Sequence, residues 1–197
     1  MKPASNSKMK ERRLARQREQ QRTQLIRISA IAGGVLVLFL LGYFVVRGNQ
    51  PYTDIEGLQR FSVRGGHTNQ TVNYPEVPPV GGIHNPAWQN CGVYTQPVTN
   101  ENAVHSLEHG AIWITYQPDL PAEELARLQT LTRQSGYRLL SPYPDLPSPI
   151  VASAWGYQIQ LEQADDPRLA QFIRSFEQSP RAPEPGASCA GGVGQPE

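Results

Sequence analysis

The sequence predicts an α+β fold, a small mixed sheet with two helices in the order β-α-β and then β-β-α. Four short runs rich in β-branched and aromatic residues predict strands, because such side chains fit a pleated, half-buried surface. Two other segments repeat apolar residues at three- and four-residue spacing, which predicts one buried face of a helix. Both segments begin at a proline, Pro121 and Pro167, a residue that suits the first helical turn.

The first half of this fold runs from a strand at residues 111–116 to a strand at residues 137–140. The first of these runs is almost continuously apolar, as expected of a buried strand. The intervening helix begins at Pro121, carries glutamates in its first turn and is stopped by Gly136. These residues match the preferences of the two helix ends.

The second half contains strands at residues 150–155 and 157–161, which form a hairpin or one bulged strand. Asp165 or Asp166 caps the last helix, which starts at Pro167. This order of elements matches the core of thioredoxin-like folds without their linking helix. The chain has no Cys-x-x-Cys pair, so the likeness concerns the fold and implies no thiol chemistry.

A long segment rich in Gly, Pro and Asn, residues 65–97, precedes the predicted core. Such a composition interrupts regular elements repeatedly. Three aromatic side chains, Tyr74, Trp88 and Tyr94, give the segment apolar surface to bury. We therefore expect a long but ordered loop.

Residues 28–46 form a run of nineteen residues without a charge. About 20 apolar residues cross a bilayer as a helix, whereas a signal peptide has a shorter apolar region that ends at a small-residue cleavage site. The run has no such site, so we expect an uncleaved, single-pass transmembrane helix with the lipid bilayer as partner. Residues 1–27 hold nine Lys/Arg against two Glu, which predicts a basic cytoplasmic tail.

The rest of the chain is expected outside the cytoplasm, as a spacer at 47–60, an α+β domain at 61–180 and a Pro/Gly-rich tail at 181–197. From Arg47 onward there are nine Arg, no Lys and fifteen Asp/Glu. Recognition of nucleic-acid phosphates requires a basic surface. The charge balance therefore excludes nucleic acid as the main partner.

Cys91 and Cys189 are the only cysteines, and both lie in the part expected to be exported. An oxidising exterior favours a disulfide between them. It would close a loop of about a hundred residues, worth up to roughly 4–5 kcal/mol in the chain-entropy model. The alternative is that Cys91 is a thiolate metal ligand.

All four histidines lie between residues 67 and 109. Neutral imidazole is the commonest metal ligand, and imidazole-rich sites suit copper(II) or zinc. Two of the histidines are four residues apart and so share one face of a helical turn. The candidate ligands are His84, His105 and His109, with His67 as a fourth; the candidate supporting residues are Tyr74, Trp88 and Glu108.

The segment His105-x-x-Glu108-His109 also matches the H-x-x-E-H pattern, in which two histidines bind zinc and the glutamate is a general base. In that pattern the helix continues, whereas Gly110 and a predicted strand follow here. The sequence therefore favours metal binding without catalysis. Histidines that only hydrogen-bond the loop to the sheet edge remain an equal alternative.

The motifs PPVGGIHNPAWQNCGVY at residues 78–94 and AVHSLEHGAIWITYQPDLP at residues 103–121 resemble the bacterial domain-of-unknown-function family 3105 (DUF 3105). The resemblance covers roughly residues 60–180, with Gly81 in place of the family's usual serine. It implies a membrane-anchored exported domain, and it implies no activity. The matching polar positions are His67, Tyr74, His84, His105, Glu108 and His109.

We therefore expect a cell-membrane protein whose extracytoplasmic domain binds copper, zinc or a small polar ligand through clustered histidines. The first alternative is a non-enzymatic module with structural histidines that contacts other envelope proteins. The second is a metal-dependent hydrolase in which Glu108 is the general base.

Overall fold

The computed structural model describes residues 55–197 and, before them, residues 22, 24, 29, 33–39 and 42–43. The chain divides into two units, residues 1–51 and 52–197. Residues 33–39 of the first unit are helical. Among the described residues, no helix combines the length and the apolar character needed to cross a bilayer. Much of the predicted transmembrane segment 28–46, and nearly all of the predicted tail 1–27, lies outside the described residues.

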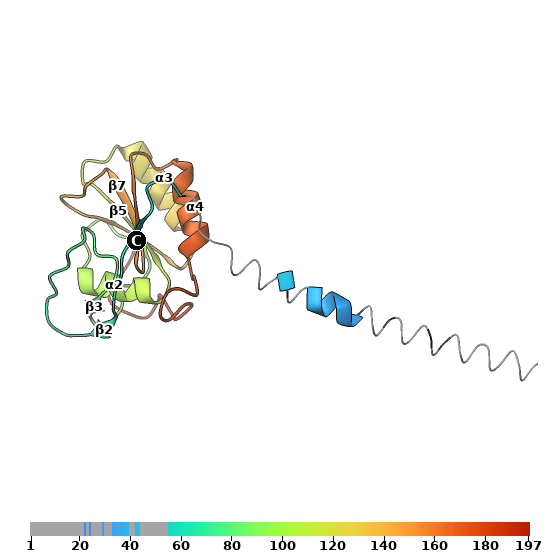
Figure 1. Cartoon of the computed structure of the whole chain (residues 1–197). Coiled ribbons are helices and arrows are strands. Elements are labelled where there is room, and N and C mark those ends of the chain that lie inside the picture. The colour runs from blue at the N-terminus through green and yellow to red at the C-terminus, as the bar shows by residue number, and fades with distance from the viewer. Residues whose placement is uncertain (1–21, 23, 25–28, 30–32, 40–41, 44–54) are drawn as a thin grey trace, which may run out of the picture. The chain divides into compact units, whose positions relative to one another are not determined.

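The second unit is built on a six-stranded mixed sheet (Figure 1) in the order β1-β8-β7-β5-β6-β4. Strand β5 is parallel to β6 and antiparallel to β7, which is antiparallel to β8. These four strands confirm the mixed sheet predicted from the sequence. The strands are β1 (Gln59–Arg60), β4 (Gly92–Val93), β5 (Ile112–Tyr116), β6 (Arg138–Pro142), β7 (Ile150–Ala154) and β8 (Tyr157–Leu161).

Both predicted helices are present, as α3 (Ala122–Thr132) and α4 (Pro167–Phe176). The side chain of Asp166 caps α4 by accepting a hydrogen bond from a backbone N–H of the first turn. The β5 residues Ile112 and Ile114 pack on one face of the sheet, in a core with residues of α3 and α4. The two helices therefore cover this face (Figure 1).

A third helix, α2 (Asn100–Glu108), lies on the opposite face of the sheet. Side chains alternate along a strand, so Trp113 points away from α3 and α4 and packs against Val104 and Leu107 of α2. Two helices were predicted for this domain, and α2 is a third, in a segment for which the sequence predicted only a single helical turn. Its asparagines and Val104 have low helix propensity, and burial of its apolar side chains under the sheet compensates for that.

The long Pro/Gly-rich segment is ordered, as predicted. It contains two short strands, β2 (Gly66–His67) and β3 (Ile83–His84), which pair in parallel with His67 opposite His84. A few residues further on, β4 joins the main sheet beside β6. The loop is therefore fixed at both ends, next to α2.

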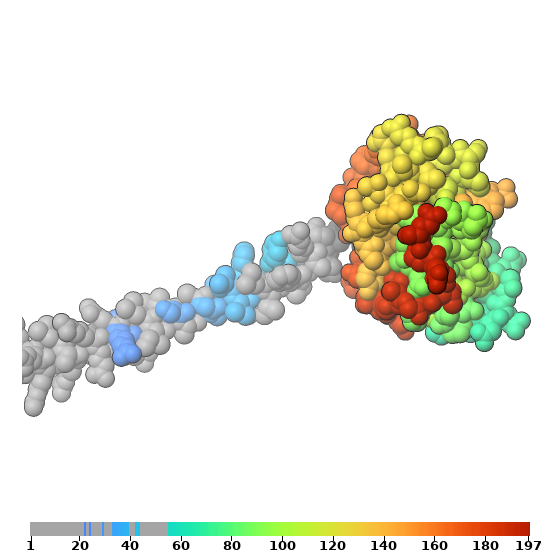
Figure 2. All heavy atoms as spheres, turned by 180° about the vertical axis from the view of Figure 1, so that it is seen from behind, coloured from blue at the N-terminus to red at the C-terminus, as the bar shows by residue number. Residues whose placement is uncertain are grey.

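The C-terminal residues lie across this loop (Figure 2, dark red). The backbone N–H of Asn90 donates to the carbonyl of Val193 at 2.9 Å. The disulfide between Cys91 and Cys189 is present as predicted, with Cα atoms 5.4 Å apart across 98 residues of sequence. The Pro/Gly-rich tail therefore packs on the same unit as the loop.

Gly110 ends the α2 segment with φ of +91°, and a Cβ there would lie 2.9 Å from the Cα of Gln178. We expect Gly110→Ala to lower the free energy of unfolding by about 2 kcal/mol, from left-handed backbone strain and the contact with a neighbouring backbone. Gly136→Ala is a matched control, because nothing lies within 4 Å of its added Cβ. Urea unfolding should show the control unchanged or slightly stabilised, and equal losses in both variants would contradict this account.

Candidate metal centre

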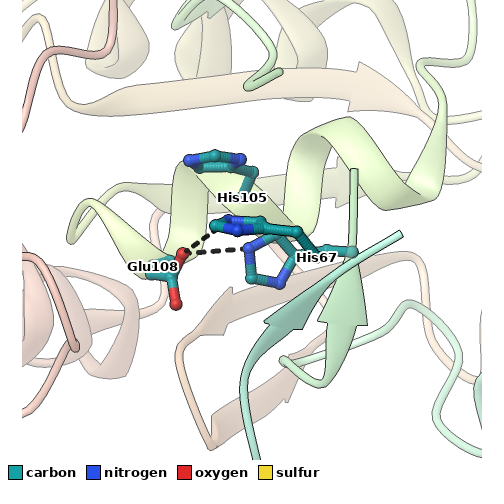
Figure 3. Close-up of side chains that lie close together, drawn as sticks. His67, His105 and Glu108 are labelled. Atoms are coloured by element: carbon teal, nitrogen blue, oxygen red, sulfur yellow. Dashed lines mark hydrogen bonds and ion pairs between the residues drawn. The ribbon is translucent and has the colours of Figure 1, made fainter. Parts of the chain in front are cut away.

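Three segments of the chain bring four side chains together where the loop meets α2. His67 comes from β2 and His84 from the adjacent β3, while His105 and Glu108 come from α2. One potential ligand atom of each residue lies within 4.8 Å of the others. Figure 3 shows the rings of His67 and His105 and the carboxylate of Glu108 gathered on one side of the helix. This arrangement is a His/Glu group that could hold a metal ion.

His84 is fully buried, and both of its ring nitrogens face oxygen atoms. Nδ1 lies 2.8 Å from the carbonyl oxygen of Gly82, and Nε2 lies 2.9 Å from Oε2 of Glu108. A carbonyl and a carboxylate both only accept hydrogen bonds, whereas a neutral imidazole carries a single proton. One of the two contacts therefore needs a further positive charge, either a second proton or a metal ion.

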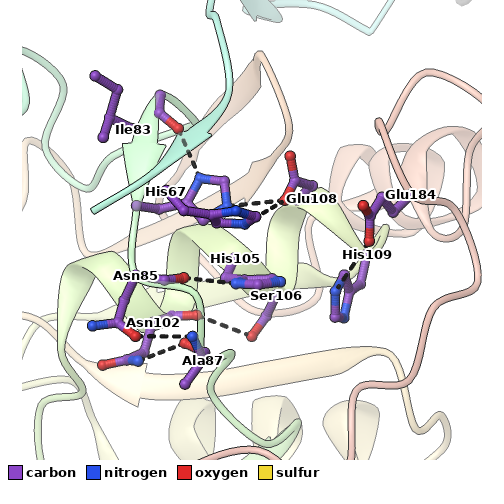
Figure 4. A network of polar contacts seen from close by, with 12 residues as sticks. His67, Ile83, Asn85, Ala87, Asn102, His105, Ser106, Glu108, His109 and Glu184 are labelled. Carbon is purple, nitrogen blue, oxygen red and sulfur yellow. Dashed lines mark hydrogen bonds and ion pairs between the residues drawn. The ribbon is translucent and has the colours of Figure 1, made fainter. Parts of the chain in front are cut away.

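His105 is held in a similar way (Figure 4). Its Nδ1 donates to the carbonyl oxygen of Asn85 at 2.7 Å, which leaves Nε2 with a lone pair in the neutral ring. Burial lowers the pKa of His105 below its ordinary value, and the nearby His109 and His84 act in the same direction. The hydrogen bond to Asn85 and the charge of Glu108 oppose this shift. The net effect favours the neutral ring, which is the form that binds a metal.

His67 and Glu108 complete the group. Oε2 of Glu108 lies 3.6 Å from Nε2 of His67, whose side chain is 50% exposed. The His67 ring stacks on that of His105 at a centroid distance of 5.1 Å and meets His84 edge-on at 4.8 Å. His67 therefore forms the solvent-facing side of a group whose other members are buried.

The donor set consists of three imidazole nitrogens and one carboxylate oxygen. In a tetrahedral zinc site with Zn–N bonds of about 2.0–2.1 Å, neighbouring ligand atoms lie roughly 3.3 Å apart. The separations of 2.9 and 3.6 Å at Glu108 Oε2 bracket that value. An ion would thus require only small side-chain movements at these contacts.

His109 lies beside the group rather than in it. It is the C-cap residue of α2, its Nδ1 donates to the carbonyl oxygen of Ser188 at 2.7 Å, and its Nε2 lies 3.7 Å from Oε2 of Glu184. Its ring touches that of His105, with centroids 4.6 Å apart. Of the four histidines expected as ligands, the structure therefore groups three with Glu108 and ties the fourth to the C-terminal segment.

The predicted supporting residues lie around the group. The Tyr74 hydroxyl donates to the carbonyl oxygen of Ile83 at 2.7 Å, and burial, with the charge of Glu101, raises the pKa of Tyr74. The Trp88 ring is tilted against both His105 and His109. Within the described part of the chain, its Nε1 is buried without a hydrogen-bond partner.

Several contacts were not predicted from the sequence. The carbonyl groups of Gly82, Asn85 and Ser188 orient the rings, and Trp155 meets the His84 ring edge-on at 5.7 Å. A main-chain carbonyl carries no residue-specific signal, so no sequence pattern could have identified these three. Trp155 follows a buried strand, where an aromatic side chain is expected for packing alone.

The fold and this site define a mixed α+β domain with a His/Glu group that is buried except for His67. The sequence profile of the family described as "Protein of unknown function (DUF3105)" matches residues 67–191. The match covers more than half of the 197 residues, so the chain belongs to this family, as the motif resemblance predicted. It includes every member of the His/Glu group and both cysteines. Comparisons with curated proteins and with solved structures gave no match.

The disulfide holds the segment that contacts His109 against the loop. We expect the double variant Cys91→Ala/Cys189→Ala to lower the free energy of unfolding by about 2–5 kcal/mol, because the unfolded chain gains freedom when a loop of this length is opened. Urea unfolding of the oxidised protein and the variant would measure the difference. Wild-type protein in reductant is the control and should match the variant; equal stability of oxidised and reduced protein would contradict the prediction.

Proposed function

We propose that this protein binds a transition metal, copper(II) or zinc, through His67, His84, His105 and Glu108. The observation that carries the proposal is the contact between His84 Nε2 and Glu108 Oε2 at 2.9 Å, in a ring whose Nδ1 already faces a carbonyl. A cation ligated by both atoms would remove the conflict between two acceptors. A second proton would also remove it, but would not explain the other two imidazoles.

The donor chemistry favours copper(II) or zinc over copper(I). Imidazole and carboxylate ligands suit these ions, whereas copper(I) prefers thiolate and thioether sulfur. Both cysteines are joined in the disulfide, and the only methionines are Met1 and Met9. Within residues 55–197, which contain no methionine, no free sulfur ligand therefore accompanies the histidines.

We further propose that the domain is held outside the cytoplasm by a single membrane-spanning helix. The support comes from the uncharged run at residues 28–46 and the basic residues before it. The disulfide agrees with an oxidising compartment. On this proposal the lipid bilayer is a partner, and other envelope proteins are within reach of the domain.

The strand order β8-β7-β5-β6, with its one parallel pair, supports a thioredoxin-like core. The two cysteines are 98 residues apart and bonded to each other, unlike the closely spaced pair of a thiol oxidoreductase. The fold therefore adds no redox activity to the proposal.

Two other functions compete with this proposal. In the hydrolase alternative Glu108 is a general base and His109 is a ligand, but Glu108 lies among the ligand atoms and His109 lies outside them. The geometry thus favours binding over catalysis. In the structural alternative the histidines only fix the loop, and their Nδ1 hydrogen bonds to main-chain carbonyls support it.

A substitution that preserves these Nδ1 hydrogen bonds distinguishes a metal-binding role of the histidines from a purely structural one. His105→Asn retains an N–H for the Asn85 carbonyl and removes the Nε2 lone pair. We expect full-length protein to bind copper(II) or zinc with Kd of about 1 μM or tighter, and this variant to bind at least about tenfold more weakly. Isothermal titration calorimetry measures both constants.

His109→Asn is the matched control, because it retains a donor for the Ser188 carbonyl. Its affinity should stay within about threefold of wild type, a difference below about 0.7 kcal/mol. Equal losses in both variants would favour the H-x-x-E-H pair as ligands. Absence of binding in wild type, with a lower melting temperature in both variants, would favour structural histidines.

Glu108→Gln tests whether the positive charge at the His84–Glu108 contact comes from a metal ion or from a second proton. The introduced amide can donate to His84 Nε2 while Nδ1 donates to Gly82, so the metal-free network becomes satisfied. We expect unchanged or higher stability without metal, and loss of the stabilisation by saturating metal, which is about 2.7 kcal/mol at one hundred times Kd. If the contact is instead a permanent buried ion pair, thermal and urea unfolding should show a loss of about 3–5 kcal/mol.

A further inference from the structure

The four candidate ligands differ sharply in how firmly they are held. His84 and His105 are buried, and each is fixed by a hydrogen bond from Nδ1 to a main-chain carbonyl. Glu108 is buried on α2. Within the described residues His67 has no such anchor, and its closest charged partner, Glu108 Oε2, lies at 3.6 Å, beyond an ordinary hydrogen bond.

The strand that carries His67 is short. Strand β2 has two residues and pairs with a strand of two residues. Two glycines precede His67, and a Cβ at Gly65 would lie 3.0 Å from Oε1 of Glu108 and 3.4 Å from the Trp155 ring. A side chain at Gly65 would therefore require the Glu108 carboxylate to shift by a few tenths of an ångström, so the glycine allows the backbone to pass close to the carboxylate.

The ring of His67 separates the rest of the group from solvent. Its ring lies over His105 and against the edge of His84, with half of its side chain in solvent. Figures 3 and 4 show it on the side of α2 where β2 and β3 lie, close to the Glu108 carboxylate. Rotation of this one side chain would expose the position that it occupies and leave the other three ligands in place.

From these observations we propose that ligand exchange at the metal takes place at the His67 position, where a nitrogen donor from outside the domain can replace this imidazole. This inference rests on the proposed function. In the exchange step the bond from the metal to His67 Nε2 breaks and a bond from an incoming neutral imidazole forms. The charge of the ion does not change, and no proton or electron is transferred.

Replacement of the His67 side chain by dissolved imidazole tests the inference. In full-length His67→Gly, with free zinc or copper(II) held constant by a chelating buffer, we expect Kd to rise about tenfold or more. Added imidazole should bring Kd back to within about threefold of wild type. The control 1,3-dimethylimidazolium has a similar shape but no lone pair, and it should restore nothing.

A kinetic measurement gives a second readout. Transfer of metal from the wild-type protein to a histidine-containing chelator should have a rate that rises with chelator concentration, because the incoming donor takes part in the step. A rate independent of chelator, or a His67→Gly variant that is not restored by imidazole, would overturn the inference while leaving the metal site intact. So would a His67→Gly variant that binds as tightly as wild type. A wild-type protein that binds neither ion would overturn the proposed function itself.

Discussion

The contact between His84 and Glu108 is the constraint on which the site depends. Gly82 and Glu108 present oxygen acceptors to the two nitrogens of one buried ring, and burial makes an unsatisfied contact of this kind costly. The loop places the ring, and α2 places the carboxylate. If α2 moved away from β3, the His84–Glu108 contact would break, and the ring would no longer need a second proton or a metal ion.

The rest of the unit holds α2 and β3 in position relative to each other. Trp113 of the central strand supports α2 from below through Val104 and Leu107. Beyond the helix end, the backbone N–H groups of Glu184 and Gly186 donate to the carbonyls of Glu108 and His109. The C-terminal segment thus satisfies carbonyl groups that a helix end leaves unpaired, and the disulfide keeps that segment in place.

Much of the fold could be predicted because its signals are local. The apolar runs gave β5, β7 and β8, and prolines with acidic residues marked the starts of α3 and α4. Helix α2 was missed because its stability comes from packing under the sheet rather than from propensity. The clustering of the histidines was also predictable from their number. That Glu108 joins the group while His109 lies outside it was not predictable. It depends on the positive φ of Gly110 and on contacts with residues about eighty positions away.

The parallel pairing of β2 with β3 extends over only two residues, with His67 opposite His84. Side chains alternate along a strand, so a slip of one residue would turn the His67 imidazole to the other face. A ladder this short has little cooperativity of its own. On the proposed metal-binding function, ligation by both histidines would therefore select one alignment of the segment, and removal of the ion would loosen this pairing before it loosened the six-stranded sheet.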